Sequence, residues 1–210
     1  MPNEKWGKKT CYDIVNAWLD HLFNNGGDEG KSIVEDFIKA DAINAIYIEF
    51  VEGLESDGTT NPLNGTIMMP LDMGVATDDG GIGYEASAFG HELYHLLRQP
   101  SDEMGLAKTE KEAYDFQATL QKNMEIPLSP AVEAISSLGN SQEDLQKVAE
   151  ALDVPLAYSL TEQDPVTNWV AKRVVNVLEL VSGCYLGGTS SIWCPAPSNN
   201  YDIRYVPPSH

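Results

Sequence analysis

Apolar residues recur at helical spacing in the first part of the chain. Between Thr10 and Phe23 they return every three or four positions and share one face, which is typical of an amphipathic helix: Cys11, Ile14, Val15, Trp18, Leu19, Leu22 and Phe23. The polar run Asn24-Asn25-Gly26-Gly27 is expected to end this helix. Similar patterns and start signals predict further helices over about 32–40, 84–98 and 109–124, two short ones from Ser129-Pro130 and Ser141, and a last one from Asp164-Pro165 to Gly183.

Two segments have the composition of strands. Residues 43–51 (INAIYIEFV) are rich in β-branched and aromatic side chains, and residues 66–73 (TIMMPLDM) look extended. Pro70 lies inside the second segment and cannot donate to a ladder, so we expect 66–73 to be an edge strand. The residues from Ser56 to Gly65 are expected to form a polar loop, and those from Thr77 to Gly83 a flexible stretch.

The order of these elements is helices first, then a few strands, then many helices, which indicates an α+β domain. At 210 residues the chain is long enough for one sizeable core, so we expect a single domain over 1–210. Three parts are predicted within it: N-terminal helices and strands over 1–83, a pair of helices over 84–125, and a helical subdomain with an irregular tail over 126–210.

The second part contains an H-E-x-x-H pattern, His91-Glu92-Leu93-Tyr94-His95, inside a predicted helix. Residues four apart lie one turn apart on the same face, so both imidazoles can reach one zinc ion at about 2.0–2.1 Å. A chance or structural pair of histidines is the alternative, but the chain has only four histidines and a buried pair would need polar partners. We therefore predict that His91 and His95 bind Zn²⁺ and that Glu92 takes a proton from the metal-bound water.

A catalytic zinc site needs a third protein ligand and an open position. The chain lacks the glycine and third histidine of the longer H-E-x-x-H-x-x-G-x-x-H pattern, so a carboxylate is expected. Glu112 is the preferred candidate because it borders the apolar stripe of a helix that can return antiparallel past the first; Glu110 is the second choice and Glu103 the third. Glu112 also fits a capping box with Thr109, in which its carboxylate would serve the helix N-terminus instead.

With these residues the chain resembles a gluzincin, the class of H-E-x-x-H zinc peptidases whose third ligand is a glutamate on a following helix. The resemblance covers roughly Thr66 to Leu120 and implies a zincin-like fold, in which a small mixed sheet packs its edge strand on the active-site helix. In that class an edge strand upstream of the metal helix binds the substrate backbone, and 66–73 is placed to be that strand.

Two narrower resemblances follow from the same region. The run from Glu110 to Phe116 is similar to the third-ligand helix of regulatory peptidases that cleave phage-type repressors, although no helix-turn-helix module accompanies it. The chain length and the His-Glu-Leu-x-His motif also resemble small bacterial effector proteases related to clostridial neurotoxin light chains, which act as toxins inside host cells.

The expected reaction is hydrolysis of a peptide bond in a protein or peptide substrate. Zinc would polarise the scissile carbonyl, and Glu92 would carry a proton from water to the leaving amine. Tyr201, Arg204 and Tyr205 are candidates for the donor that stabilises the oxyanion, with simple packing of the tail as the alternative. Other interpretations stay open: a hydrolase acting on another amide, a regulatory peptidase that cleaves a cellular repressor, or a binding module that uses zinc only for folding.

Charge narrows the choice of partners without predicting an oligomeric state. Thirteen basic against 32 acidic residues give a formal charge of −19, which repels phosphate and argues against nucleic acid and anionic membranes. No apolar run approaches the roughly 18 residues of a membrane span, and no Sec signal is recognised. We therefore expect a cytoplasmic protein, export by a signal-independent route, or a fragment whose leader is missing. Cys184 and Cys194 are interpreted as thiols, with a disulfide as the alternative in an oxidising compartment.

Overall fold

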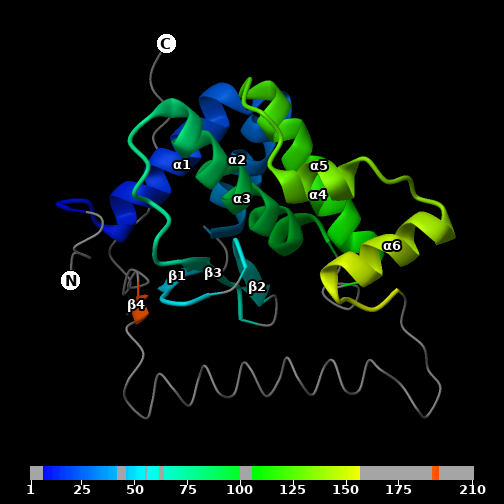
Figure 1. Cartoon of the computed structure of the whole chain (residues 1–210). Helices are drawn as coiled ribbons and strands as arrows, with labels where there is room; N and C mark the ends of the chain where they lie inside the picture. The colour runs from blue at the N-terminus through cyan, green and yellow to red at the C-terminus, as the bar shows by residue number, and fades with distance from the viewer. Residues whose placement is uncertain are drawn as a thin grey trace, which may run out of the picture.

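The computed structural model describes residues 7–41, 46–54, 56–61, 64–99, 106–156 and 191–193. In these ranges the chain is a mixed α+β protein, with its helices gathered on one side of a small sheet (Figure 1). The helices are α1 (Cys11–Asn25), α2 (Gly27–Asp41), α3 (Asp79–Arg98), α4 (Ala107–Asn123), α5 (Pro130–Ser136) and α6 (Gln142–Leu152). The strands are β1 (Tyr47–Val51), β2 (Thr59–Asn61), β3 (Thr66–Pro70) and β4 (Ser191–Trp193).

The sheet has the strand order β2-β3-β1-β4, so β3 is an internal strand. It pairs in parallel with β1, which places Ile67 opposite Ile48, and antiparallel with β2. The prediction that residues 66–73 form an edge strand is therefore wrong. Pro70 is tolerated because Leu71 N donates to Val51 O, which turns the nitrogen of Pro70 toward β2, where the pairing has already ended at Met68.

The edge position belongs instead to β2, which lies inside the segment predicted to be a polar loop. Its three residues pair with β3, with Thr60 opposite Ile67. The Thr60 hydroxyl also bonds to the backbone oxygen of Glu92 at 3.1 Å, which fixes β2 against α3. Short polar edge strands are common in native sheets because they discourage pairing with other chains, and they have the composition of loops.

One hydrophobic core lies between the sheet and the helices. Alternating residues of β1 and β3 point into it: Ile48, Phe50, Ile67 and Met69. The helices contribute large, fully buried side chains, among them Trp18, Leu22, Phe37, Phe89 and Leu120. A second, smaller cluster consists of Ala107, Ile135, Val148, Ala149 and Val154, from α4, α5, α6 and the residues after α6. Because α4 contributes to both clusters, its position is fixed from two sides.

The start signals in the sequence correctly predicted where several helices begin. Thr10 and Asp13 form a capping box at the start of α1, and α5 and α6 follow the predicted caps Ser129 and Ser141. Helix α4 begins two residues earlier than expected, at Ala107, and two other helices begin five residues earlier. Helix α3 starts at Asp79, inside the predicted flexible stretch, because the side chain of Asp78 accepts a hydrogen bond from Gly81 N at 2.8 Å. Helix α2 starts at Gly27, directly after the glycine that ends α1.

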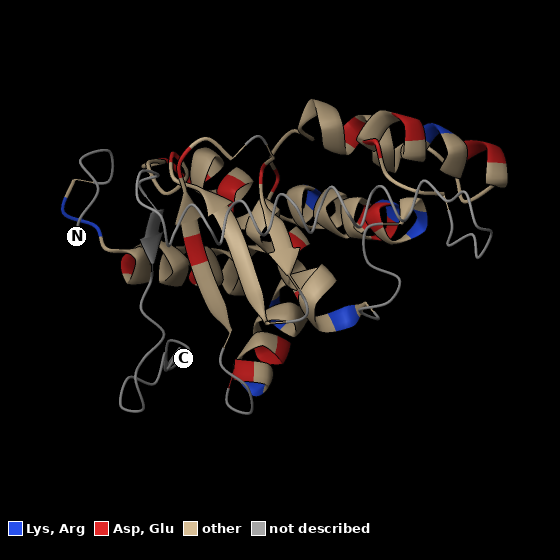
Figure 2. Ribbon diagram, turned by 90° about the horizontal axis from the view of Figure 1, so that it is seen from below, with Lys and Arg blue, Asp and Glu red and all other residues tan. Residues whose placement is uncertain are grey.

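Other predictions fall outside the described ranges. These are the helix from Asp164-Pro165 to Gly183 and the tail with Cys184 and Cys194, of which only the β4 backbone is described. Of the described helices, none is both long and apolar enough to cross a membrane. Acidic positions are spread over helices and loops rather than gathered on one element (Figure 2).

Candidate metal centre

Helix α3 carries the H-E-x-x-H residues through the interior of the protein. From Ala86 to Leu93 every residue of this helix is buried, because the sheet covers one side and α4 packs against another. His91, Glu92 and His95 keep only 7, 6 and 4% of their surface exposed. Burial of three polar side chains on one helix segment is costly unless each finds a partner or a ligand.

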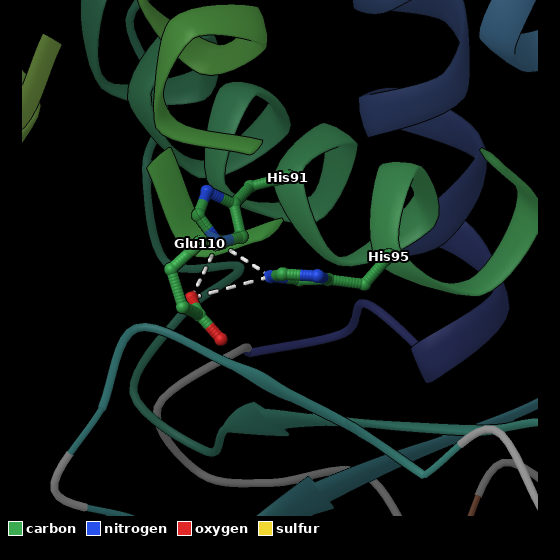
Figure 3. Close-up of side chains that lie close together, drawn as sticks. All are labelled: His91, His95 and Glu110. Atoms are coloured by element: carbon green, nitrogen blue, oxygen red, sulfur yellow. Dashed lines mark hydrogen bonds and ion pairs between the residues drawn. The ribbon is translucent and has the colours of Figure 1, made fainter. Parts of the chain in front are cut away.

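The two imidazoles point toward each other and toward a carboxylate from α4 (Figure 3). The Nε2 atoms of His91 and His95 are 3.1 Å apart. Glu110 Oε2 lies 3.4 Å from His95 Nε2 and 3.9 Å from His91 Nε2. Two ligand atoms of a tetrahedral zinc ion, each at about 2.0–2.1 Å, are roughly 3.3 Å apart. The donor set and its spacing therefore form a cluster that could hold a metal ion.

The third member of the cluster is Glu110 and not Glu112, which corrects the preferred assignment. Helix α4 begins at Ala107, and two positions differ by about 200° around a helix, so only one of the two glutamates can face α3. The side chain of Glu112 is 41% exposed, with Lys108 Nζ at 3.9 Å. The capping-box alternative also fails, because Thr109 lies within α4 and its hydroxyl accepts from Leu106 N. Glu103, the third choice, lies outside the described ranges.

The cluster stabilises positive charge. Burial lowers the pKa of His95, but hydrogen bonding to the Glu110 carboxylate, the nearby charges of Glu110 and Glu92, and the Gln99 side chain outweigh burial and raise it to about 9. Burial likewise raises the pKa of Glu110, but His91 and His95 reverse that effect and hold it well below its usual range. The two shifts share one main cause: the anionic carboxylate of Glu110 faces the imidazoles, and each group favours the charged form of the other.

Glu92 is held from the sheet side by β2. Thr60 Oγ1 donates to Glu92 Oε2 at 2.7 Å. The preceding backbone is equally close: a Cβ atom added at Gly58 would lie 2.7 Å from Glu92 Cγ and 2.9 Å from Oε1. Glycine at position 58 therefore lets the chain pass directly over this carboxylate. The sequence pattern gave no sign of either residue, because both lie in the segment expected to be a loop.

Two further side chains contact the histidines from outside the cluster. Gln99 lies one helical turn after His95, and its Oε1 is 2.6 Å from His95 Nδ1. The ring of Tyr114 stands edge-on to His91, with ring centroids 4.7 Å apart. Burial and the charges of Glu110, Asp57 and Glu92 raise the pKa of Tyr114 to about 12. The four-residue spacings from His95 to Gln99 and from Glu110 to Tyr114 are the sequence signals that could have identified them.

The structure thus brings His91, His95 and Glu110 together and leaves Glu112 outside, while Glu92, next to His91 in the sequence, has its carboxylate bonded to Thr60. Tyr201, Arg204 and Tyr205, the candidates for the oxyanion donor, lie outside the described ranges. Comparison of the chain with models of protein families, with curated proteins and with solved structures finds no match. What the cluster does must therefore be argued from its own side chains.

Proposed function

We propose that this chain is a zinc-dependent peptidase, with His91, His95 and Glu110 as metal ligands and Glu92 as the catalytic base. The observation that carries the proposal is the convergence of two Nε2 atoms and one carboxylate oxygen within 4.8 Å of one another. A glutamate follows the first histidine directly and is itself buried and positioned. Each feature alone has a structural explanation, but their combination matches what hydrolysis at a metal centre requires.

The donor set favours zinc over the other common divalent cations. Two imidazoles and one carboxylate suit zinc, whereas magnesium and calcium prefer sites made of oxygen atoms. The described residues offer three protein ligands, the number found in catalytic zinc sites, which keep a position for water or substrate, while structural sites close with four. Bound there, zinc supplies a Lewis acid that polarises a carbonyl and lowers the pKa of water.

Glu92 serves as the base because of its place beside the cluster. A general base must be held within hydrogen-bond reach of the proton that it takes, and Thr60 restrains the Glu92 carboxylate through Oε2. In the proposed reaction this carboxylate accepts a proton from water and returns it to the leaving amine. The ring of Tyr114 contacts His91, which makes its hydroxyl a candidate partner for a reacting oxygen.

The substrate is proposed to bind in extended form along β2. This strand ends the sheet beside α3, and an added peptide strand would continue the ladder next to the metal cluster. A small mixed sheet whose edge strand packs on the metal helix is also the arrangement of a zincin-like fold, with β2 in place of residues 66–73. The net charge of −19 favours basic segments as substrates.

The substitution Glu92→Gln tests the proposal. We expect the variant to bind zinc as the natural protein does and to lose peptide cleavage by at least about 100-fold, because the amide cannot take a proton. Both proteins are incubated with a peptide library made from a cell lysate, new N-termini are identified by mass spectrometry, and bound metal is measured by elemental analysis.

Glu85→Gln is the matched control. Glu85 is a second buried glutamate of α3, but its carboxylate holds Trp18 Nε1 at 3.0 Å and Ala76 N at 3.3 Å, away from the cluster. Its loss should leave cleavage intact in the folded protein. Cleavage by Glu92→Gln at the natural rate would refute the assigned base, and zinc binding without any new N-termini would favour a non-catalytic binding module or a hydrolase of another amide.

A further inference from the structure

The side chain of Gln99 connects the two helices that form the metal centre. Gln99 is the first residue after α3, where the backbone becomes extended, with φ −112° and ψ 141°. Its side chain makes two hydrogen bonds. Oε1 lies 2.6 Å from His95 Nδ1, and Nε2 donates to the backbone oxygen of Thr109 at 2.7 Å. Thr109 directly precedes Glu110 in the first turn of α4.

These two bonds determine which nitrogen of His95 carries a proton. The backbone oxygen of Thr109 can only accept, so the amide nitrogen of Gln99 must face it and the amide oxygen must face His95. An amide oxygen cannot donate, and therefore His95 Nδ1 must be the donor. In a neutral imidazole this leaves the lone pair on Nε2, the atom that lies 3.1 Å from His91 Nε2 and 3.4 Å from Glu110 Oε2.

His91 is held in a different way. Its Nδ1 is buried and has no hydrogen-bond partner within the described part of the chain, and its ring packs edge-on against Tyr114. Hydrogen bonding from outside the cluster thus fixes one of the two histidines, and packing fixes the other. Residues that bond to metal-binding histidines commonly change metal affinity by 10–100-fold when they are removed.

We propose that Gln99 is a positioning residue of the metal centre, which sets the metal-binding tautomer of His95 and ties it to the turn of α4 that carries Glu110. This inference rests on the proposed function, because it assumes that His91, His95 and Glu110 bind a metal ion. It assigns to one side chain both the orientation of a ligand and the distance between the two helices that supply the ligands.

Zinc titration of three variants tests the proposal. Gln99→Leu removes both hydrogen bonds and is expected to lower the affinity for Zn²⁺ by 10–100-fold, measured by competition with a chromophoric chelator. Gln99→Glu keeps an acceptor for His95 Nδ1 but loses the donor to Thr109 O, so it should restore the part of the affinity that depends on His95. Cobalt titration supplies a spectroscopic signature: the visible bands of bound Co²⁺ should be altered in Gln99→Leu and close to natural in Gln99→Glu.

Gln121→Leu is the matched control for the loss of a bridging glutamine. Gln121 is buried in α4, donates to Ser87 on α3 at 2.9 Å and accepts from Ser129 N at 3.0 Å, away from the cluster. We expect this variant to unfold at lower urea concentration while its folded form binds Zn²⁺ with natural affinity. If Gln99→Leu does not fold, Gln99→Asn takes its place, because a side chain one methylene shorter cannot bridge both partners.

The outcomes separate this inference from the proposed function. Natural zinc affinity in folded Gln99→Leu, or an equal loss in Gln121→Leu, overturns the role of Gln99 and leaves the metal centre standing. A natural protein that binds neither Zn²⁺ nor Co²⁺ overturns the metal centre itself, and the role of Gln99 with it. Loss of affinity in Gln99→Leu with recovery in Gln99→Glu supports both.

Discussion

Helix α4 carries two glutamates, Glu110 and Glu112, that differ in burial and in the direction in which their side chains point. Glu110 faces the histidines of α3, whereas Glu112 faces solvent. We predict that Glu110→Gln lowers the affinity for Zn²⁺ by more than about 100-fold, because a neutral amide is a poor replacement for an anionic ligand. Glu112→Gln, which removes the same charge two residues away, should bind zinc within about twofold of the natural protein. Competition with a chelator measures both, and equal losses would contradict the assignment.

A second prediction concerns pH and applies to the metal-free protein. The pKa of His95 is about 9 in the folded state against an ordinary 6.5, so protonated His95 stabilises the fold. This stabilisation is fully present below about pH 6.5 and is lost as the pH rises through 9, with a decrease in the free energy of unfolding on the order of 3 kcal/mol. Urea unfolding in the presence of a chelator measures it. The decrease should be much smaller in Glu110→Gln, and a natural protein equally stable at both ends of this range would contradict the prediction.

At the scale of residues, the sequence could identify part of the site because that part is local. His91, Glu92 and His95 lie in five consecutive positions, and helical spacing alone brings the two imidazoles together. The choice between Glu110 and Glu112 depends on how α4 is rotated about its axis. The buried face of α4 includes polar residues, among them Lys111 and Gln121, so the apolar residues alone did not show its full extent. Thr60 reaches Glu92 across 32 positions of sequence, and no local pattern carries that information.

At the scale of elements, predictions held where a start or stop depends on neighbouring residues. Helices α1, α5 and α6 begin at side chains that satisfy free backbone N–H groups or at proline, which are local signals. The order of the strands depends on pairing between distant segments. The proline rule correctly excluded a ladder bond at Pro70 but could not show that β2 would pair with β3 before that position.

The contact between α1 and α2 yields a prediction about stability. A Cβ atom added at Gly30 would lie 2.2 Å from the backbone oxygen of Leu22. This oxygen belongs to the backbone of α1, so the clash can be relieved only if one of the two helices shifts. Gly30→Ala should therefore lower the free energy of unfolding by at least about 1–3 kcal/mol.

Gly80 provides the control. At Gly80, in the first turn of α3, the nearest atom to an added Cβ would be Asp78 Oδ1 at 3.4 Å. Gly80→Ala should leave stability unchanged or raise it by up to about 1 kcal/mol. Urea unfolding compares the two, and equal effects would show that the close approach of α1 and α2 is not the cause.

At the scale of the whole molecule, acidic charge complicates any measurement of metal binding. The formal charge is −19, and acidic residues are spread along the described helices, strands and loops (Figure 2). Exposed carboxylates bind divalent cations weakly, and they prefer Mg²⁺ and Ca²⁺ to a greater degree than a site with two imidazoles does. Excess Mg²⁺ should therefore displace zinc from the surface and leave the ion at His91, His95 and Glu110 in place.

Under those conditions, removal of zinc distinguishes a catalytic centre from a structural one. The main core is built of apolar side chains, among them Trp18, Phe50 and Phe89, so we expect it to stay packed when the metal ion is removed. We predict that a chelator leaves the helical circular dichroism signal unchanged and lowers the melting temperature only moderately. Zinc at about 100 times its dissociation constant should restore roughly 2.7 kcal/mol of stability, because it binds the folded state alone. Zinc should add little stability to the Glu110→Gln variant. Cooperative loss of helical signal on chelation would instead mean that the ion holds the fold together, as in a zinc-stabilised binding module.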